Sequence, residues 1–519
     1  MKLNRILVAS ASALALSVGM AAADNNVALL NQTGSGNSAL IDQSAATNST
    51  AGVHARTNPN SEINQLGDDN DLNFTQIGDN NRIATGDAFV QGGNQNRAVA
   101  TQDGDDNRFD YMIQRGGSAT SLSNDLTVVQ TGDGNRVKEV RQTLSGGTDP
   151  NTAMISQIGD GHVAGGRIRQ AGSDNMLNIS QTGNDNTIAP RNNIVGAPSA
   201  SPSLSSINQE GQSNMMTVTQ GGSGNLLRQA QQIGDDNITD LFMDGMGNGV
   251  PMLTAGGASG ASGAMEAAID QFGDANQAQL SFTGNDNAYG VLQEGNLNLA
   301  LGILVSGNDN SVGVGQIGDE NEIALAEVTG NFNSIGFAQT GNQNFGSASV
   351  SGNSNDSLIV QTGDRNETYL QVNGGNNMAS LVVTGDDNYL NAKQRQRRNQ
   401  MTVEVTGSGN NNVAFSSPFS GAALMARDFV RNDPLGDSLF RRGDLFQRGT
   451  GNPGGSRNEL TLTVVGDSNS FATYQRGDRN EAIGTITGSF NQAVVGQIGA
   501  DNSATFAQVG NNNNLGIMQ

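Results

Sequence analysis

The sequence predicts an all-β fold, a β-solenoid with two strands in each rung and inserted surface loops. Three observations lead to this prediction. A short motif, Gln-x-Gly-x-x-Asn, recurs along the chain; the residues between its copies alternate between two faces; and the prolines lie outside the copies. Self-similarity at a short period is typical of repeat architectures, in which a unit buries its apolar face only against its neighbours.

The motif occurs in two forms. Strict copies start at Gln32, Gln65, Gln76, Gln91, Gln102, Gln130, Gln170, Gln181, Gln209, Gln220, Gln232, Gln271, Gln293, Gln316, Gln339, Gln361, Gln447, Gln475, Gln497 and Gln508. Copies with an apolar residue in place of Gln start at Met243, Phe282, Val305, Val328, Val350, Val372, Val383, Val405, Val464 and Ile486. From Gln271 to Val372 the two forms alternate, so the period there is 22 to 23 residues and two unequal halves make one rung.

The segments between copies are predicted to be strands with one buried face. In 333–339 and 502–508, Asn, two small or apolar residues and Gln occupy alternate positions. This period of two is that of a β-strand. The Gly of each motif is expected in the turn, because it adopts positive φ without strain. The Gln and Asn side chains are then expected inside, where stacked amides bond along the axis as in cross-β structures.

Six stretches break the period and are expected to loop out from the solenoid surface. They are Asn48–Ser61, Gly116–Asn124, Leu144–Asn151, Ala189–Ser206, Gly249–Ala264 and Ser416–Phe446. Lys2, Arg5, a short apolar run and the small residues 21–23 predict a cleaved secretory signal. The predicted organisation is a signal peptide over 1–23, a repeat solenoid with loop insertions over 24–415, an irregular insertion over 416–446, and C-terminal repeats over 447–519.

The composition excludes several classes of function. The chain has no Cys and only two His, His54 and His162, so we expect no enzyme, no cofactor and no metal site. Its net charge of −22 argues against nucleic acid, whose phosphates need a basic face. No apolar run of spanning length follows the signal, so no membrane span is expected in the mature chain.

The repeat, in paired strands after a secretory signal, resembles the curlin repeat of curli fibre subunits. Residues 91–102 and 497–508 both match Gln-x-Gly-x-x-Asn-x-Ala-x-x-x-Gln position for position, and the resemblance covers most of 27–519. It implies a secreted structural subunit that leaves through the periplasm by Sec export and a curli-type outer-membrane channel. It also implies self-assembly, with a nucleator or other curli subunit, into extracellular amyloid fibres (a fimbrium) for biofilm matrix and adhesion. By resemblance, the structural amyloid ladder falls on Gln91, Asn96, Gln102, Asn107, Gln293, Asn298, Gln316, Asn321, Gln339, Asn344, Gln361, Asn366, Gln475, Asn480, Gln497, Asn502, Gln508 and Asn513.

The chain also departs from the family pattern, because it is longer, has large insertions and often places Val where Gln is usual. These departures leave open whether it is a main subunit, a nucleator or a modifier. They also leave open a monomeric β-solenoid adhesin at the cell surface that binds through its insertions. The final half-repeat stops on Gln519 without a polar cap, which favours polymerisation.

Two sets of charges allow two interpretations each. Acidic residues in the turns reflect turn preference and solubility, or they are gatekeepers that slow assembly until salt or a divalent ion screens them. The arginines of 395–398 and of the last insertion are solvated loop residues, or they contact acidic turns or a surface polysaccharide.

Overall fold

The computed structural model describes residues 25–52, 63–84, 89–116, 124–145, 149–189, 206–251, 253, 265–412, 419–434, 440–451, 455 and 457–519. The predicted signal peptide and His54 lie outside these residues. The described residues form two compact units, and each unit is described by itself. Unit 1 comprises Met1–Val250 and Ala267–Asn276, and unit 2 comprises Pro251–Glu266 and Gln277–Gln519.

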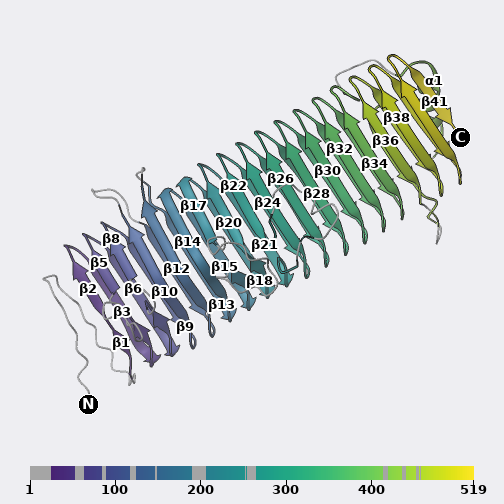
Figure 1. The fold of residues 1–519 in the computed structure, drawn as a ribbon. Coiled ribbons are helices and arrows are strands. Elements are labelled where there is room, and N and C mark those ends of the chain that lie inside the picture. The colour runs from purple at the N-terminus through teal and green to yellow at the C-terminus, as the bar shows by residue number, and fades with distance from the viewer. Residues whose placement is uncertain are drawn as a thin grey trace. The chain divides into compact units, whose positions relative to one another are not determined.

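Unit 1 contains two parallel sheets, and the chain passes from one sheet to the other in each rung (Figure 1). Sheet A contains β1 (Val27–Ala28), β2 (Leu30–Thr33), β4 (Thr50–Ala51), β5 (Ile63–Leu66), β7 (Arg82–Ile83), β8 (Phe89–Gly92), β10 (Arg108–Arg115), β12 (Arg136–Leu144), β14 (Val163–Ser173), β16 (Thr187–Ile188), β17 (Ser206–Gln212), β19 (Leu226–Leu227), β20 (Gln229–Ile233) and β22 (Ala268–Phe272). Sheet B contains β3 (Ser38–Thr47), β6 (Asp71–Asp79), β9 (Arg97–Asp103), β11 (Asp125–Thr131), β13 (Thr152–Asp160), β15 (Met176–Asn184), β18 (Met215–Ser223) and β21 (Ile238–Met246).

Unit 2 repeats this arrangement with more uniform strands. Its sheet A contains β24 (Ala288–Glu294), β26 (Ser311–Ile317), β28 (Ser334–Thr340), β30 (Asp356–Thr362), β32 (Met378–Thr384), β34 (Gln400–Thr406), β36 (Glu459–Val465), β38 (Glu481–Thr487) and β40 (Ser503–Val509). Its sheet B contains β23 (Gln277–Thr283), β25 (Leu299–Ser306), β27 (Glu322–Thr329), β29 (Phe345–Ser351), β31 (Glu367–Asn373), β33 (Tyr389–Arg395), β35 (Asp444–Arg448), β37 (Ser470–Arg476), β39 (Gln492–Ile498) and β41 (Asn514–Met518).

The register confirms the predicted fold class, a β-solenoid with two strands in each rung. Each strand of unit 2 pairs in parallel with the next strand but one; in β26 and β28, for example, Val314 lies opposite Phe337 and Gln316 opposite Gln339. Alternate residues of these strands face the space between the two sheets, where Val314 and Phe337 are fully buried. Such a strand buries one face only by stacking on a neighbour, which is why the repeat builds a solenoid.

Several predicted insertions include residues that belong to the solenoid. Thr50 and Ala51 form β4, Leu144 and Ser206 belong to β12 and β17, and β35 begins at Asp444, before the predicted end of the last insertion. Asn124 and Asn151, taken from the sequence as the last residues of loops, are buried and already bonded to neighbouring rungs. Each takes the place of the ladder Asn in its turn, although no Gly stands three residues before it as in the motif.

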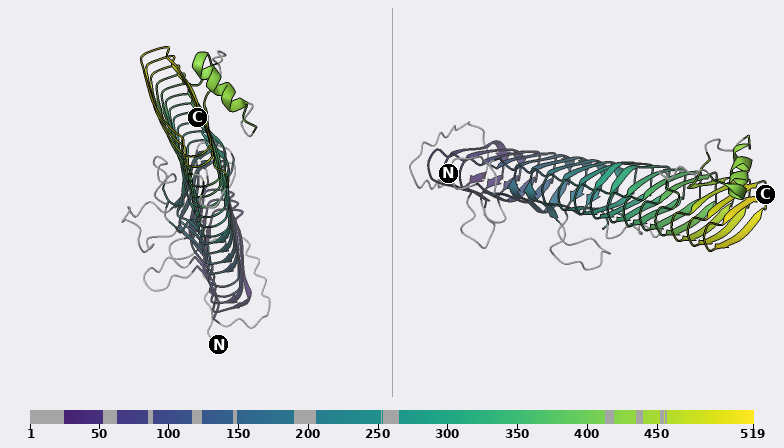
Figure 2. Two further views of the ribbon diagram at one scale, coloured as in Figure 1. Left: turned by 90° about the vertical axis from the view of Figure 1, so that its right-hand side faces the viewer. Right: turned by 90° about the horizontal axis from the view of Figure 1, so that it is seen from above.

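The last insertion contains an element that the sequence did not predict. Within 416–446, expected to be irregular, helix α1 runs from Gly421 to Arg431 and buries Ala423, Ala426 and Val430 on one face. Figure 2 shows it beside the strands of unit 2, where it lies against the outer face of β39 and β41.

The surface beneath α1 is shaped for a close approach. The outward side chains of Ala472, Tyr474 and Val494 form an apolar cluster with the helix. At Gly516, in β41, an added Cβ would lie 2.1 Å from the carbonyl oxygen of Ala422, so only glycine lets the helix lie this near the sheet.

Candidate functional site

The glutamines of the repeat bond to one another from rung to rung inside each unit. Gln339 is fully buried, and its Nε2 donates to Oε1 of Gln361 at 2.8 Å. Its own Oε1 accepts from Nε2 of Gln316 at 2.8 Å. The same Nε2 also donates to the carbonyls of Glu322 and Asn344 at 3.2 and 3.1 Å. These partners offset the large cost of burying an amide.

Both sheets of unit 1 carry such a ladder. In sheet A the bonded glutamines are Gln32, Gln65, Gln91, Gln114, Gln142, Gln170, Gln209, Gln232 and Gln271. In sheet B they are Gln43, Gln76, Gln102, Gln130, Gln157, Gln181 and Gln220. The sheet B ladder stops where Met243 lies opposite Gln220.

In unit 2 one sheet carries the Gln ladder while the other carries an apolar column. Sheet A begins with Gln293, Gln316, Gln339 and Gln361, and sheet B with Phe282, Val305, Val328, Val350 and Val372. The two sheets then exchange roles. Sheet A continues with Val383, Val405, Val464 and Ile486, and sheet B with Gln394, Gln447, Gln475, Gln497 and Gln519.

The asparagines form a second kind of ladder, at the turns. The backbone N–H and Nδ2 of Asn344 donate to Oδ1 of Asn321 at 3.1 and 3.0 Å. Its Nδ2 also donates to the carbonyl of Gly363 at 2.7 Å. Its Oδ1 accepts from the backbone N–H and Nδ2 of Asn366 at 3.1 and 3.0 Å. One Asn side chain therefore connects three successive rungs.

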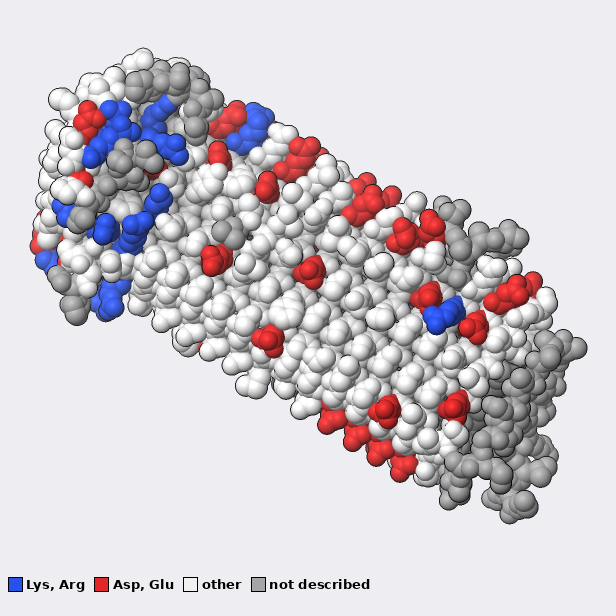
Figure 3. Space-filling model, turned by 180° about the vertical axis from the view of Figure 1, so that it is seen from behind, with Lys and Arg blue, Asp and Glu red and all other residues white. Residues whose placement is uncertain are grey.

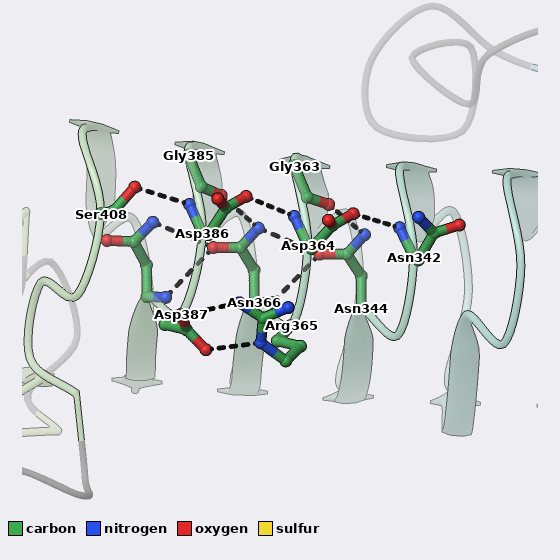
Figure 4. Close-up of polar contacts among 11 residues, drawn as sticks. Asn342, Asn344, Gly363, Asp364, Arg365, Asn366, Gly385, Asp386, Asp387 and Ser408 are labelled. Carbon is green, nitrogen blue, oxygen red and sulfur yellow. Dashed lines mark hydrogen bonds and ion pairs between the residues drawn. The ribbon is translucent and has the colours of Figure 1, made fainter.

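A third row of bonds runs along the outside of the turns (Figure 4). The backbone N–H of Asp364 donates to Oδ1 of Asp386 at 2.8 Å, and that of Asp386 donates to Oγ of Ser408 at 3.1 Å. Asp, Asn and Ser share this position because each supplies an oxygen acceptor. The turn acids thus bond neighbouring rungs directly, in addition to any effect of their charge on assembly, which stays a prediction.

This geometry, stacked two-strand rungs closed by Gln and Asn ladders, is the context for the comparison with known families. A family model described as the curlin associated repeat matches residues 148–188. The predicted resemblance to the curlin repeat is confirmed. No curated protein matches the chain. Within 149–188 the curlin-type repeats form β13, β14, β15 and β16 and supply Gln157, Gln170 and Gln181 to the ladders.

Nearly all the residues predicted from the resemblance lie in these ladders. The nine asparagines of that set are each bonded to the Asn of a neighbouring rung. Eight of the nine glutamines are bonded to another Gln. Gln508 is the exception, because the residue opposite it is Ile486; its Nε2 donates to the carbonyl of Gln492 and its Oε1 has no partner.

Other ladder residues escaped the sequence motif. Gln43, Gln114, Gln142 and Gln394 lack the Gly or the Asn of the strict copy, yet each is bonded in a ladder. Their signal is the alternation of the preceding strand, which puts the Gln on the inward face. The copy that starts at Gln447 differs in another way, since Asn458 fills the ladder position six residues after the Asn of the motif.

His162 takes the place of an Asn in a curlin-type ladder. Its backbone N–H donates to Oδ1 of Asn135 at 3.0 Å, and its Nδ1 accepts from the backbone N–H of Asn186 at 3.3 Å. Nε2 lies 3.1 Å from the carbonyl of Ile158, as a donor in the neutral tautomer. Burial lowers the pKa of His162 below that of an exposed imidazole. The side chain is therefore a neutral substitute for Asn.

Paired charges line some turns. Arg365 donates to both carboxylate oxygens of Asp387 in the next rung, at 2.8 and 2.9 Å (Figure 4). Arg479 does the same to Asp501 at 2.5 and 2.6 Å. The hydrogen bond from the guanidinium in each pair holds the pKa of the Asp below its usual value. Both pairs are exposed, so their net contribution to stability is small.

The part of the chain that the structure describes contains neither a candidate metal site nor a candidate membrane-spanning helix. No three or more His, Cys, Asp and Glu side chains there lie close enough together to hold a metal ion. The described residues also include no helix with the length and apolar character needed to cross a membrane.

Proposed function

We propose that this protein is a secreted, curli-like structural subunit that self-assembles into extracellular amyloid fibres of a biofilm matrix. The observation that carries the proposal is the rung-to-rung ladder. A rung presents Gln and Asn amides on one side that match the Gln and Asn amides of the following rung. A second copy carries the same repeat, so its rungs fit the same surface by the same bonds.

The match to the curlin associated repeat supports the cellular setting of this proposal. Curli-related proteins are extracellular, and the sequence begins with a segment that reads as a secretory signal. We therefore include Sec export, a curli-type outer-membrane channel and a nucleator or other curli subunit as partners. The proposed role is structural rather than enzymatic, and the buried polar side chains of the ladders, which hold rungs together, support it.

A matched charge variant tests the assembly. Gln475 and Gln497 are buried and bonded to each other at 2.9 Å. In the Gln475→Glu, Gln497→Glu double variant, two carboxylates of nearly the same shape would face each other. We expect wild-type protein to bind an amyloid dye and give fibres with a meridional spacing of about 4.7–4.8 Å. The variant is expected to assemble poorly at pH 7 and to recover at about pH 3, where most of its Glu carboxyls are protonated.

Two results would argue against the proposal. Wild-type protein that stays monomeric and leaves the dye spectrum unchanged would exclude fibre formation and favour the monomeric adhesin. Fibres that form equally well from both proteins at pH 7 would show that assembly does not use the Gln ladder.

A further inference from the structure

The corner that follows β33, β35 and β37 in unit 2 carries a column of arginines. Arg395 ends β33 and lies in register with Arg448 of β35, which lies in register with Arg476 of β37. Neighbouring strands are about 4.8 Å apart. Like charges placed directly opposite on neighbouring strands are destabilising. Arg395 lies over the ring of Phe446, at 5.5 Å from its centroid, but the stacking of three arginines in register is not explained by the stability of the sheet.

A second column lies in the turns at the same corner. Arg398, Arg457 and Arg479 each come directly before the ladder Asn of three successive rungs. All three adopt left-handed backbone conformations, with φ of 60, 73 and 57°. Arg397 lies in the turn that contains Arg398. We call the seven residues Arg395, Arg397, Arg398, Arg448, Arg457, Arg476 and Arg479 the arginine corner.

Only part of this charge is compensated nearby. Arg476 pairs with Asp433 at 2.7 Å, and Arg479 pairs with Asp501. The other five arginines make no ion pair with a described residue, and most of them are exposed. In Figure 3 most of the Lys and Arg side chains in view are gathered in one region, and Asp and Glu are scattered over the rest of this face.

Unit 1 carries a charge pattern of opposite sign. Asp79, Asp105, Asp133 and Asp160 occupy the same turn position in four successive rungs, and all are exposed. The backbone N–H of each of the first three donates to Oδ1 of the next Asp, at 2.7 to 2.8 Å, and that of Asp160 donates to Oδ1 of Asn184 at 3.4 Å. In Asp105, Asp133 and Asp160 the second carboxylate oxygen accepts no bond from a described residue. We call these four residues the acidic row.

We propose that the arginine corner of one copy binds the acidic row of a second copy, side against side. Both arrays repeat once per rung, so their charges have the same spacing along the axis and several pairs form in one alignment. A guanidinium suits the remaining carboxylate oxygens because it donates in a planar fork. The contact joins lateral surfaces. It therefore goes beyond the proposed fibre and does not depend on it.

Charge neutralisation that preserves the turn tests this contact. Arg397→Gln with Arg398→Gln removes two charges, and Gln already occupies this left-handed position at Gln95, with φ of 60°. Asp105→Asn with Asp133→Asn removes two opposite charges and keeps the Oδ1 acceptor. Other turns use Asn for this acceptor. The matched control is Arg82→Gln with Arg115→Gln, two exposed arginines of unit 1.

The measurement is sedimentation velocity of freshly prepared, dye-negative full chain at about 0.01 M and about 0.3 M salt. Electrostatic screening differs widely between these conditions. We expect wild-type protein to self-associate at low salt and to dissociate at high salt. Each neutralised pair is expected to weaken association about tenfold, and the control less than about twofold.

Three results would overturn the proposal. Wild-type protein could show no salt-dependent association. The control could weaken association as much as the arginine variant does. Lastly, the arginine variant could lose binding to added polygalacturonate while the aspartate variant left self-association unchanged, which would identify an anionic polysaccharide as the partner. Dye-negative material is used throughout, so failure of fibre assembly would not imitate any of these results.

Discussion

The interior of a Gln ladder should be far more sensitive to substitution than its end, and unit 2 offers a matched pair. Gln339 lies within the sheet A ladder, whereas Gln361 is its last member, opposite Val383. Val is a natural residue at this position of the repeat, so Gln339→Val and Gln361→Val remove the same atoms from equivalent places.

The two variants differ in what they leave unbonded. Gln339→Val leaves Oε1 of Gln361 buried without its donor. An unsatisfied buried acceptor costs about 1–3 kcal/mol. Gln361→Val leaves no such orphan, because Nε2 of Gln339 still donates to the carbonyls of Glu322 and Asn344. The loss of packing volume is common to both. We therefore expect Gln339→Val to cost about 2 kcal/mol more.

Hydrogen exchange followed by mass spectrometry measures this difference locally. A difference of about 2 kcal/mol corresponds to about thirtyfold faster exchange of the amides in β28 and β30. Gln361→Val should change their exchange only slightly. Equal exchange in the two variants, or wild-type exchange in Gln339→Val, would refute the reasoning that amide bonding between rungs stabilises the ladder.

Three further predictions concern the turns. Burial lowers the pKa of His162, so the unfolded state binds the proton more tightly than the folded state does. Wild-type protein should therefore lose stability relative to His162→Asn as the pH falls below about 6.5. Melting curves at several pH values would show this. Gly363→Ala should be much more destabilising than Gly134→Ala. Both glycines have positive φ, but only at Gly363 would a Cβ lie 2.3 Å from a carbonyl oxygen of the next rung. Equal midpoints of urea unfolding for the two variants would contradict this. Asp386→Asn should keep the stability of the wild type, whereas Asp386→Ala should lose about 1 kcal/mol because it removes the acceptor for the backbone N–H of Asp364. Faster assembly of the Asp386→Asn variant at low salt would support the gatekeeper hypothesis, and an unchanged assembly rate would count against it.

The sequence was sufficient to predict the repeating rung, because the repeat depends on residues that are close together in the chain. Alternation in 333–339 puts Gln339 and Phe337 on one face whatever the rest of the chain does. The motif likewise located the Asn ladder, since the Gly and the Asn act within a single turn. The same local criterion missed Gln114 and Gln394, whose turns differ, and it missed helix α1, which is held by side chains of strands far along the chain.

Only the tertiary structure decided which side chains of neighbouring rungs contact one another. The alternation of Gln and Val along 271–372 already predicts a Gln ladder beside an apolar one. Stacking shows in addition that the two sheets of unit 2 exchange these roles, since Gln361 lies opposite Val383 and Val372 opposite Gln394. It also shows that Gly346 faces the ring of Phe337 across the core, where an added Cβ would lie 3.2 Å from the ring and the ring would have to shift. The physical reason is that periodicity determines which face a side chain occupies, whereas its partner depends on which rungs are brought into contact.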